Sequence, residues 1–135
     1  MDHAPVGQEA IRGVTALDEI IAQADFLSIG TNDLTQFMLA ADRDAAELID
    51  DYSILHPSVL RAIRHVVQKC DAARKPLSVC GEAAGDPALV PVLVGLGVRS
   101  LSMSPTRAPA VRHALQLMDV AKSTQSAEGL LVYES

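Results

Sequence analysis

Three short groups of polar residues, each next to an apolar run, are the places where this chain could carry chemistry. They are residues 31–33 (Thr-Asn-Asp), 80–82 (Cys-Gly-Glu) and 102–104 (Ser-Met-Ser). In folds built on parallel strands, binding and catalytic residues come from the carboxyl ends of the strands. If the apolar runs are such strands, an amide, two carboxylates, a thiol and hydroxyls meet at one rim.

Together with Arg43, these residue types suit the binding of an oxyanion and a hard cation. Asp33 supplies a carboxylate ligand for Mg²⁺, and Asn32 supplies an amide donor. Arg43 supplies a permanent positive charge for a phosphate or carboxylate group. Cys80 is then the proton carrier or the nucleophile.

Each of these residues also has a purely structural interpretation. Asn32 and Asp33 could form a turn followed by a helix N-cap. Cys80 on an apolar strand could be an inert small hydrophobic residue. Arg43 stands among acidic residues, so it could belong to surface ion pairs. Cys70, within an apolar helical stripe, is assigned to packing.

The elements that must position these residues alternate along the chain. Short apolar runs predict buried strands at residues 26–29, 77–80 and 100–104. Helical periodicity predicts helices over residues 10–23, 34–39, 57–74 and 88–96, and a further helix after Pro105. The acidic segment 42–57 is expected as an exposed loop or short polar helix, and the tail after Lys122 as polar and frayed.

Three parallel strands separated by helices predict an α/β fold with right-handed crossovers. A complete (β/α)8 barrel needs about 250 residues, and this chain has 135. We therefore expect the chain to form about half of such a barrel. The expected divisions are a lead-in and helix at 1–23, the half-barrel at 24–122 and a polar tail at 123–135.

Composition limits the function classes. The sequence is 49% hydrophobic and 21% charged, which is typical of a globular domain. The formal net charge of −6 disfavours binding to nucleic acid or to anionic lipid. The longest uncharged apolar stretch, residues 87–98, is too short to span a membrane, and no signal-peptide pattern opens the sequence. We expect a cytoplasmic protein with free thiols.

The run Asp25-Phe26-Leu27-Ser28-Ile29-Gly30-Thr31-Asn32-Asp33-Leu34-Thr35-Gln36, followed by Arg43, resembles the C-terminal signature of the phosphoenolpyruvate (PEP)-utilising enzymes. Val79-Cys80-Gly81-Glu82-Ala83-Ala84-Gly85-Asp86 resembles the cysteine loop of that family, and Leu101-Ser102-Met103-Ser104 is a third match. The similarity runs from about residue 24 to about residue 117. Within the family, the chain looks most like the PEP-protein phosphotransferases (Enzyme I), and less like pyruvate phosphate dikinase or PEP synthase.

The resemblance implies a (β/α)8 barrel that binds PEP and Mg²⁺. Asn32 and Arg43 would contact PEP, Asp33 would hold Mg²⁺, and Cys80 would exchange a proton with the enolate carbon of pyruvate. The family has a second carboxylate ligand for Mg²⁺ on the preceding strand. Glu9 falls about where that ligand would stand, although its neighbours lack the expected strand and proline.

The resemblance also implies partners. In the parent enzyme, a phosphohistidine domain accepts the phosphoryl group and passes it to the carrier protein HPr. The first half of the barrel and that domain have no counterpart in this sequence, so we expect the isolated chain to be inactive. A half-barrel exposes strand edges, which favours a homodimer. The alternative is a non-catalytic dimerisation or regulatory module of the same fold.

Overall fold

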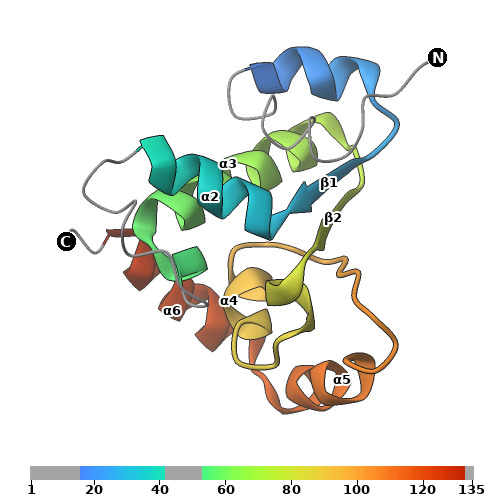
Figure 1. Ribbon diagram of the computed structural model, residues 1–135, viewed down its shortest axis with the longest axis vertical. Coiled ribbons are helices and arrows are strands. Elements are labelled where there is room, and N and C mark those ends of the chain that lie inside the picture. Colours follow the sequence, from blue (N-terminus) through green and yellow to red (C-terminus); the bar gives the residue numbers. More distant parts are fainter. Residues whose placement is uncertain (1–15, 42–52, 133–135) are drawn as a thin grey trace.

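The computed structural model describes residues 16–41 and 53–132 of the chain. Residues 16–23 are helical, which is the described part of the helix predicted over 10–23. The elements that follow (Figure 1) are β1 (Leu27–Gly30), α2 (Thr31–Ala41), the 3-10 helix η2 (Ser53–Leu55), α3 (Pro57–Ala73), β2 (Leu77–Cys80), the 3-10 helix η3 (Glu82–Gly85), α4 (Val90–Gly95), α5 (Ala108–Leu117) and α6 (Val120–Val132).

The sheet of the described residues consists of β1 and β2, which run parallel. Leu27 pairs with Leu77, and the last pair is Gly30 with Cys80, so both strands end at the same level. Side chains alternate between the two faces of a strand. Leu27, Ile29 and Val79 accordingly enter the main hydrophobic core. The other face carries residues that are only half-buried, Ser28, Ser78 and Cys80.

The prediction of a third strand over residues 100–104 is wrong for the described structure. Leu101 makes a single parallel bridge to Val79, held by Val79 N–H to Ser100 O (3.0 Å) and Ser102 N–H to Val79 O (2.9 Å). The ladder stops there because β2 ends at Cys80 and Gly81, with φ 105°, turns the chain into η3. The fold is therefore α/β and mostly helical, with a two-stranded parallel sheet that is consistent with part of a barrel.

Two predicted boundaries also differ from the structure. The helix predicted over residues 34–39 starts earlier, because α2 begins at Thr31 directly after β1. Asp33 lies in its first turn, where a carboxylate interacts favourably with the helix dipole. The tail after Lys122 is not frayed, because α6 extends from Val120 to Val132. Its Ala127 is 1% exposed and joins the core.

The helix α3 agrees with its prediction. Pro57 opens it, the His56 Nδ1 atom accepts a hydrogen bond from Ser58 N–H (3.2 Å), and Arg74 ends it in a left-handed conformation. Its apolar face is the centre of the main core, which contains Val59, Leu60, Ile63, Val66 and Val67. A smaller cluster joins α4 to α5 through Val90, Val94 and Val111.

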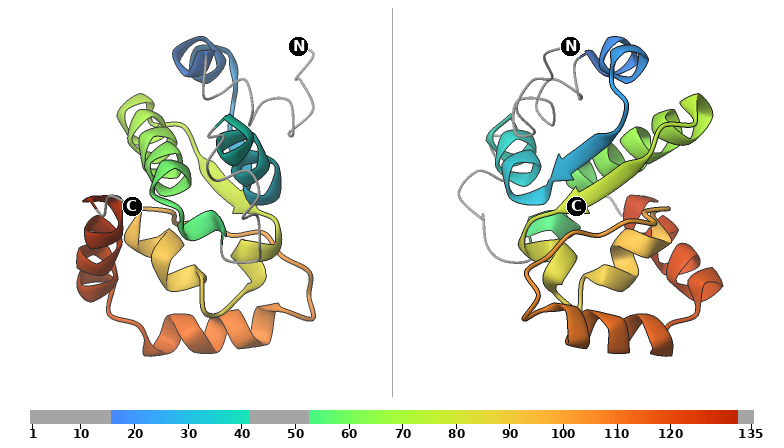
Figure 2. Two further views of the ribbon diagram at one scale, coloured as in Figure 1. Left: turned by 60° about the vertical axis from the view of Figure 1, so that its left-hand side comes forward. Right: turned by 90° about the vertical axis from the view of Figure 1, so that its right-hand side faces the viewer.

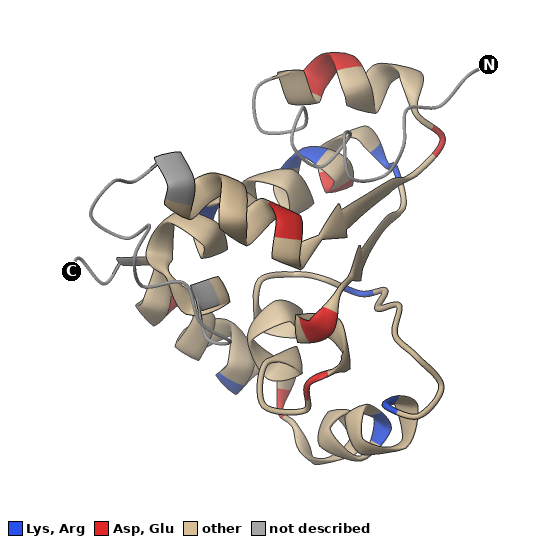
Figure 3. Cartoon of the chain, viewed as in Figure 1, with Lys and Arg blue, Asp and Glu red and all other residues tan. Residues whose placement is uncertain are grey.

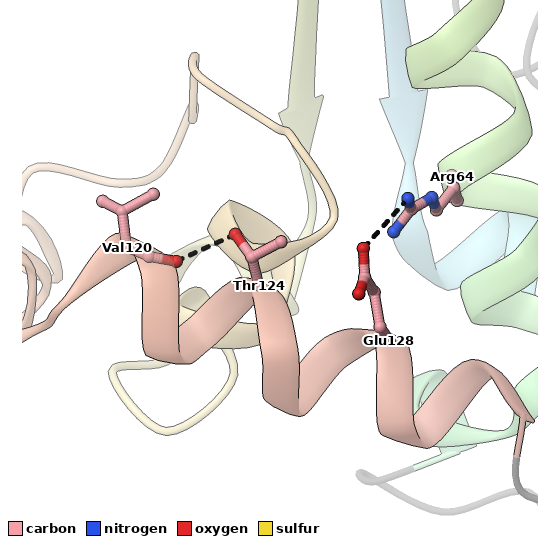
Figure 4. A network of polar contacts seen from close by, with 4 residues as sticks. All are labelled: Arg64, Val120, Thr124 and Glu128. Carbon is pink, nitrogen blue, oxygen red and sulfur yellow. Dashed lines mark hydrogen bonds and ion pairs between the residues drawn. The ribbon is translucent and has the colours of Figure 1, made fainter.

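The helices α4, α5 and α6 lie beyond the carboxyl end of β2 (Figures 1 and 2). The α6 helix is bound to α3 by polar contacts as well as by packing. The Arg61 guanidinium donates twice to Leu131 O (3.0 and 2.8 Å), and Arg64 pairs with Glu128 at 3.4 Å (Figure 4). In the part of the chain that the structure describes, no helix is long and apolar enough to cross a membrane.

Gly95 allows α6 to approach α4, and this contact generates a prediction. A Cβ atom at Gly95 would overlap the carbonyl group of Ser123, whose carbon would be 2.7 Å away. We expect Gly95→Ala to lower the free energy of unfolding by about 2 kcal/mol, measured by urea denaturation.

Gly129 in α6 is the matched control, because a Cβ atom there would meet nothing within 4 Å. Gly129→Ala should raise the free energy of unfolding by about 0.5–1 kcal/mol through helix propensity. Equal effects of the two substitutions would contradict the close approach of α4 and α6.

Candidate functional site

A cavity of about 810 Å³ opens at the carboxyl end of the sheet. Its walls come from four places: the start of α2, Ile54 of η2, the segment 81–89 that contains η3, and the segment between Leu101 and α5. The side chains with polar groups in these walls are Thr31, Asn32, Thr35, Gln36, Glu82, Asp86, Ser102, Ser104 and Arg107.

The junction of α2 with η3 gives the cavity its shape. Thr31 is 1% exposed, and its hydroxyl donates a hydrogen bond to Cys80 O (3.1 Å). Gly81 follows at φ 105°, and a Cβ atom there would be 2.5 Å from Thr31 Oγ1. Only glycine therefore fits between the end of β2 and the start of α2 without displacing one of them.

The predicted site residues occupy two neighbouring places. Asn32 is exposed and lines the cavity. Asp33 is exposed, and its Oδ2 atom is 3.8 Å from the position that a Cβ atom of Gly30 would take, at the end of β1. Cys80 is half-buried on the sheet face that carries Ser28, and neither Asp33 nor Cys80 lines the cavity. Arg43 and Glu9 lie outside the described residues.

Sequence reasoning missed Arg107, which supplies a cationic side chain to the cavity wall. The turn before α5 holds it there through Arg107 N–H to Ser104 O (3.0 Å). Its Cβ and Cγ atoms would each be 3.3 Å from a Cβ atom on Gly85, so its stem packs along η3. The signal was available: Arg107 comes three residues after the predicted strand end at Ser104, on the loop that reaches the same rim.

Carboxylates gather at this end of the molecule. Asp33 lies in the first turn of α2 and Glu82 in the first turn of η3, and Figure 3 shows red at the start of both elements. The cavity wall adds Asp86, whose Oδ1 atom accepts Ala88 N–H at 2.9 Å. An anionic ligand in the cavity would therefore need a cation to offset these charges.

The described residues fit one part of a magnesium site. They contain no group of three or more His, Cys, Asp or Glu side chains arranged to hold a metal. Magnesium bound to a substrate phosphate takes only one or two protein carboxylates, and the other ligands are phosphate oxygens and water. The exposed Asp33 carboxylate can serve as one such ligand.

The two cysteines are free thiols in different environments. Cys70 is 1% exposed on α3, which agrees with its predicted packing role. Burial raises the pKa of the Cys70 thiol above its ordinary value, and the neighbouring Asp71 carboxylate adds to the rise. Cys80 reaches the partly open face of the sheet.

Comparison with known proteins identifies the family. The family model described as "PEP-utilising enzyme, PEP-binding domain" matches residues 6–120. The chain belongs to the PEP-utilising enzymes. The resemblance seen in the sequence motifs is therefore confirmed over most of the chain.

Curated relatives identify the branch of the family. A "Phosphoenolpyruvate-protein phosphotransferase" of Chlamydia trachomatis is 46% identical over 89 residues, 66% of this chain and 16% of that protein. A "Multiphosphoryl transfer protein" of Xanthomonas campestris is 46% identical over 121 residues, 87% of this chain and 14% of that protein. A "Phosphoenolpyruvate-dependent phosphotransferase system" protein of Escherichia coli is 38% identical over 115 residues, 85% of this chain and 15% of that protein.

These relatives confirm the similarity to PEP-protein phosphotransferases. The chain spans only 14% to 16% of their length. The PEP-binding region of the family is what this chain matches.

The contrast between the two thiols gives a second prediction. Alkylation proceeds through the thiolate, so a buried thiol with a raised pKa reacts slowly. At pH 8 we expect iodoacetamide to modify Cys80 at least tenfold faster than Cys70. Mass spectrometry of the two cysteine peptides measures both rates in one sample.

The same reaction in denaturing urea is the control, because unfolding should bring the two rates together. Equal alkylation rates in the folded chain would contradict the burial of Cys70.

The raised pKa of Cys70 also makes the free energy of unfolding depend on pH. The buried neutral thiol favours folding below the ordinary thiol pKa, and that contribution is lost as the pH rises through the raised value.

Proposed function

We propose that this chain is the PEP-binding part of a PEP-protein phosphotransferase, and that it binds PEP together with Mg²⁺ at the carboxyl end of the β1–β2 sheet. The observation that carries the proposal is the family match over residues 6–120, together with the placement of Asn32 and Asp33 in the first turn of α2. The family match supplies the ligand class, and the fold supplies a rim on which anion and cation can both be held.

Asn32 is the substrate contact that the geometry supports best. It lines the cavity, and it lies in the first turn of an 11-residue helix whose free N–H groups favour bound anions. Arg43 is a second proposed contact to the anion, because it matches the arginine of the family motif. Arg107, which also lines the cavity, supplies a further positive charge.

Asp33 is the proposed magnesium ligand, with Glu9 as the second carboxylate that the family motif suggests. Bound Mg²⁺ would stabilise negative charge on the phosphoryl and enolate oxygens. The exposure of Asp33 and its position over the end of β1 favour this role.

Cys80 is the proposed proton carrier. When the phosphoryl group has left PEP, the enolate of pyruvate remains. The S–H bond of Cys80 breaks, its electron pair stays on sulfur, and the proton forms a C–H bond at the methylene carbon. The enolate oxygen becomes the carbonyl oxygen of pyruvate, so the negative charge moves from the enolate to the thiolate.

The proposed phosphoryl transfer needs a larger assembly than this chain. β1 pairs with β2 on one side only within the described residues, so its other edge can accept a further strand of a (β/α)8 barrel. The remaining barrel half, a phosphohistidine domain and HPr would complete phosphoryl transfer, in the cytoplasm. Leu117 and Val120, at 74% and 47% exposure between α5 and α6, favour association into a homodimer.

Titration calorimetry tests the binding proposal. Adding PEP to the 135-residue chain should release or absorb heat only when Mg²⁺ is present. Asp33→Ala should weaken binding at least tenfold, because it removes the charged ligand that holds the cation.

Asp71→Ala is the matched control, because Asp71 is also an exposed aspartate on a helix but stands at the end of α3. It should leave the affinity within about twofold. Binding that is unchanged by chelation of Mg²⁺ and by Asp33→Ala would refute the metal role. No binding by the parent chain would refute the proposed function.

Exchange of the methyl protons of pyruvate in D₂O tests Cys80. Proton NMR should show exchange above the buffer rate when the chain is combined with the missing barrel half and Mg²⁺, and Cys80→Ala in that assembly should reduce it more than tenfold without weakening PEP binding. Cys70→Ala should leave exchange unchanged. Equal exchange in the parent and in Cys80→Ala would contradict the proton-carrier role. Absence of exchange in both would instead support the non-catalytic dimerisation or regulatory module.

A further inference from the structure

The half-buried face of the sheet carries a connected row of three polar side chains, Ser78, Ser28 and Cys80. Ser28 and Ser78 are paired in the parallel register, and Cys80 follows two residues after Ser78 on the same face. All three side chains therefore lie side by side, away from the core that Ile29 and Val79 enter.

The contacts between them are continuous. The Ser78 and Ser28 hydroxyl oxygens are 3.3 Å apart, and Ser28 Oγ is 3.6 Å from Cys80 Sγ. The sulfur is also 3.5 Å from the backbone oxygen of Ile29. The last two distances are ordinary for hydrogen bonds in which sulfur is the donor or the acceptor, because its radius is larger than that of oxygen.

The backbone carbonyl at the end of the row fixes the direction of every bond. Ile29 O can only accept, so the Cys80 thiol donates to it. The sulfur is then the acceptor for Ser28, and Ser28 is the acceptor for Ser78. Both hydroxyl protons in the row therefore point toward the sulfur, while the proton of the thiol points toward Ile29 O.

We propose that Ser28 and Ser78 are positioning residues for Cys80: Ser28 holds the sulfur and stabilises its thiolate, and Ser78 acts through Ser28. The role of the thiolate rests on the proposed function, in which Cys80 gives its proton to the enolate carbon. The S–H bond then breaks and leaves its electron pair on sulfur. The Ser28 hydroxyl already donates to that sulfur, so its hydrogen bond becomes charge-assisted without a movement of the hydroxyl.

Ser78 adds to this effect because hydrogen bonds in a row polarise one another. While Ser78 donates to Ser28, the Ser28 hydroxyl is a stronger donor to the thiolate. The return of the proton from the methyl group of pyruvate reverses the same steps. Before transfer, the thiol proton turns away from Ile29 O by rotation about the Cβ–Sγ bond, while the two hydroxyl groups keep their positions.

The side-chain contacts of Cys80 leave Ser28 as the donor to its sulfur. Within the described residues, the hydrogen bonds of the Cys80 side chain are with Ser28 and the Ile29 carbonyl. The charged residues at this end of the sheet are Asp33 on α2, which lies over Gly30, and Glu82, which begins η3. Both are carboxylates and cannot donate a hydrogen bond to the sulfur when ionised.

The pH profile of Cys80 alkylation tests the proposal without PEP. The 135-residue chain is treated with iodoacetamide over pH 6–10, and mass spectrometry follows the Cys80 peptide. Ser28→Ala should slow alkylation about tenfold at pH 7 and move the profile to higher pH, because the thiolate loses its donor. Ser78→Ala should slow it about threefold. Ser28→Thr keeps the hydroxyl and should restore the parent profile.

The double variant separates a row from two independent effects. Because Ser78 acts through Ser28, Ser28→Ala with Ser78→Ala should react as slowly as Ser28→Ala alone. Multiplied effects would overturn the order of the row, and an unchanged profile in Ser28→Ala would overturn the proposal. Ser100→Ala replaces an exposed serine beside the sheet and should leave the alkylation profile of Cys80 unchanged. The alkylation rate of Cys70 should also stay the same in these variants.

Two readouts keep this proposal distinct from the proposed function. Slower alkylation of Ser28→Ala in a chain that does not bind PEP would support the positioning role and refute the function. If the chain binds PEP and Ser28→Ala has the same alkylation profile as the parent, the positioning role alone would be refuted.

Discussion

The hydrogen bond from the buried Thr31 hydroxyl to Cys80 O is the interaction on which the site depends. It joins the first residue of α2 to the last residue of β2, across strands that already end at the same level. With Gly81 turning immediately beside Thr31, η3 must follow the start of α2. A single polar contact therefore brings together chemistry-bearing residues that are about fifty positions apart in sequence.

The sequence predicts most closely those elements whose signals lie within the element itself. The strand at 77–80 and the helix from Pro57 were predicted closely, because periodicity, a proline at the first turn and a short apolar run are all contained in the segment itself. The third strand failed for a non-local reason. Leu101 has a partner in Val79, but the partner strand ends one residue later, and no property of residues 100–104 announces that.

The start of α2 and the whole of α6 were missed for different reasons. Thr31, Asn32 and Asp33 are common both in turns and in first helical turns, so composition alone does not place the start of the helix before residue 34. In α6, the polar surface outweighs a narrow apolar edge of Ala127, Leu130 and Leu131. That edge becomes significant only when α4 offers Gly95 as a place for close approach. For the site, strand ends pointed to Asn32, Asp33 and Cys80, whereas the cavity wall formed by Arg107 depends on the packing of the α5 turn against Gly85.

The two faces of the sheet explain how this chain can keep its fold while the proposed chemistry needs further residues around it. The core face is apolar and is covered by α3 and its neighbours, so most of the stabilising burial is internal to the chain. The opposite face would be costly to leave open if it were apolar. Here it carries Ser28, Ser78 and Cys80, which satisfy one another's hydrogen bonds, and no buried side-chain nitrogen or oxygen of the described residues lacks a partner. A polar, self-satisfied face needs no cover for stability. The proposed proton transfer, by contrast, requires that water be excluded from this face. The fold is therefore stabilised within the chain, whereas the proposed chemistry depends on what packs against the open face.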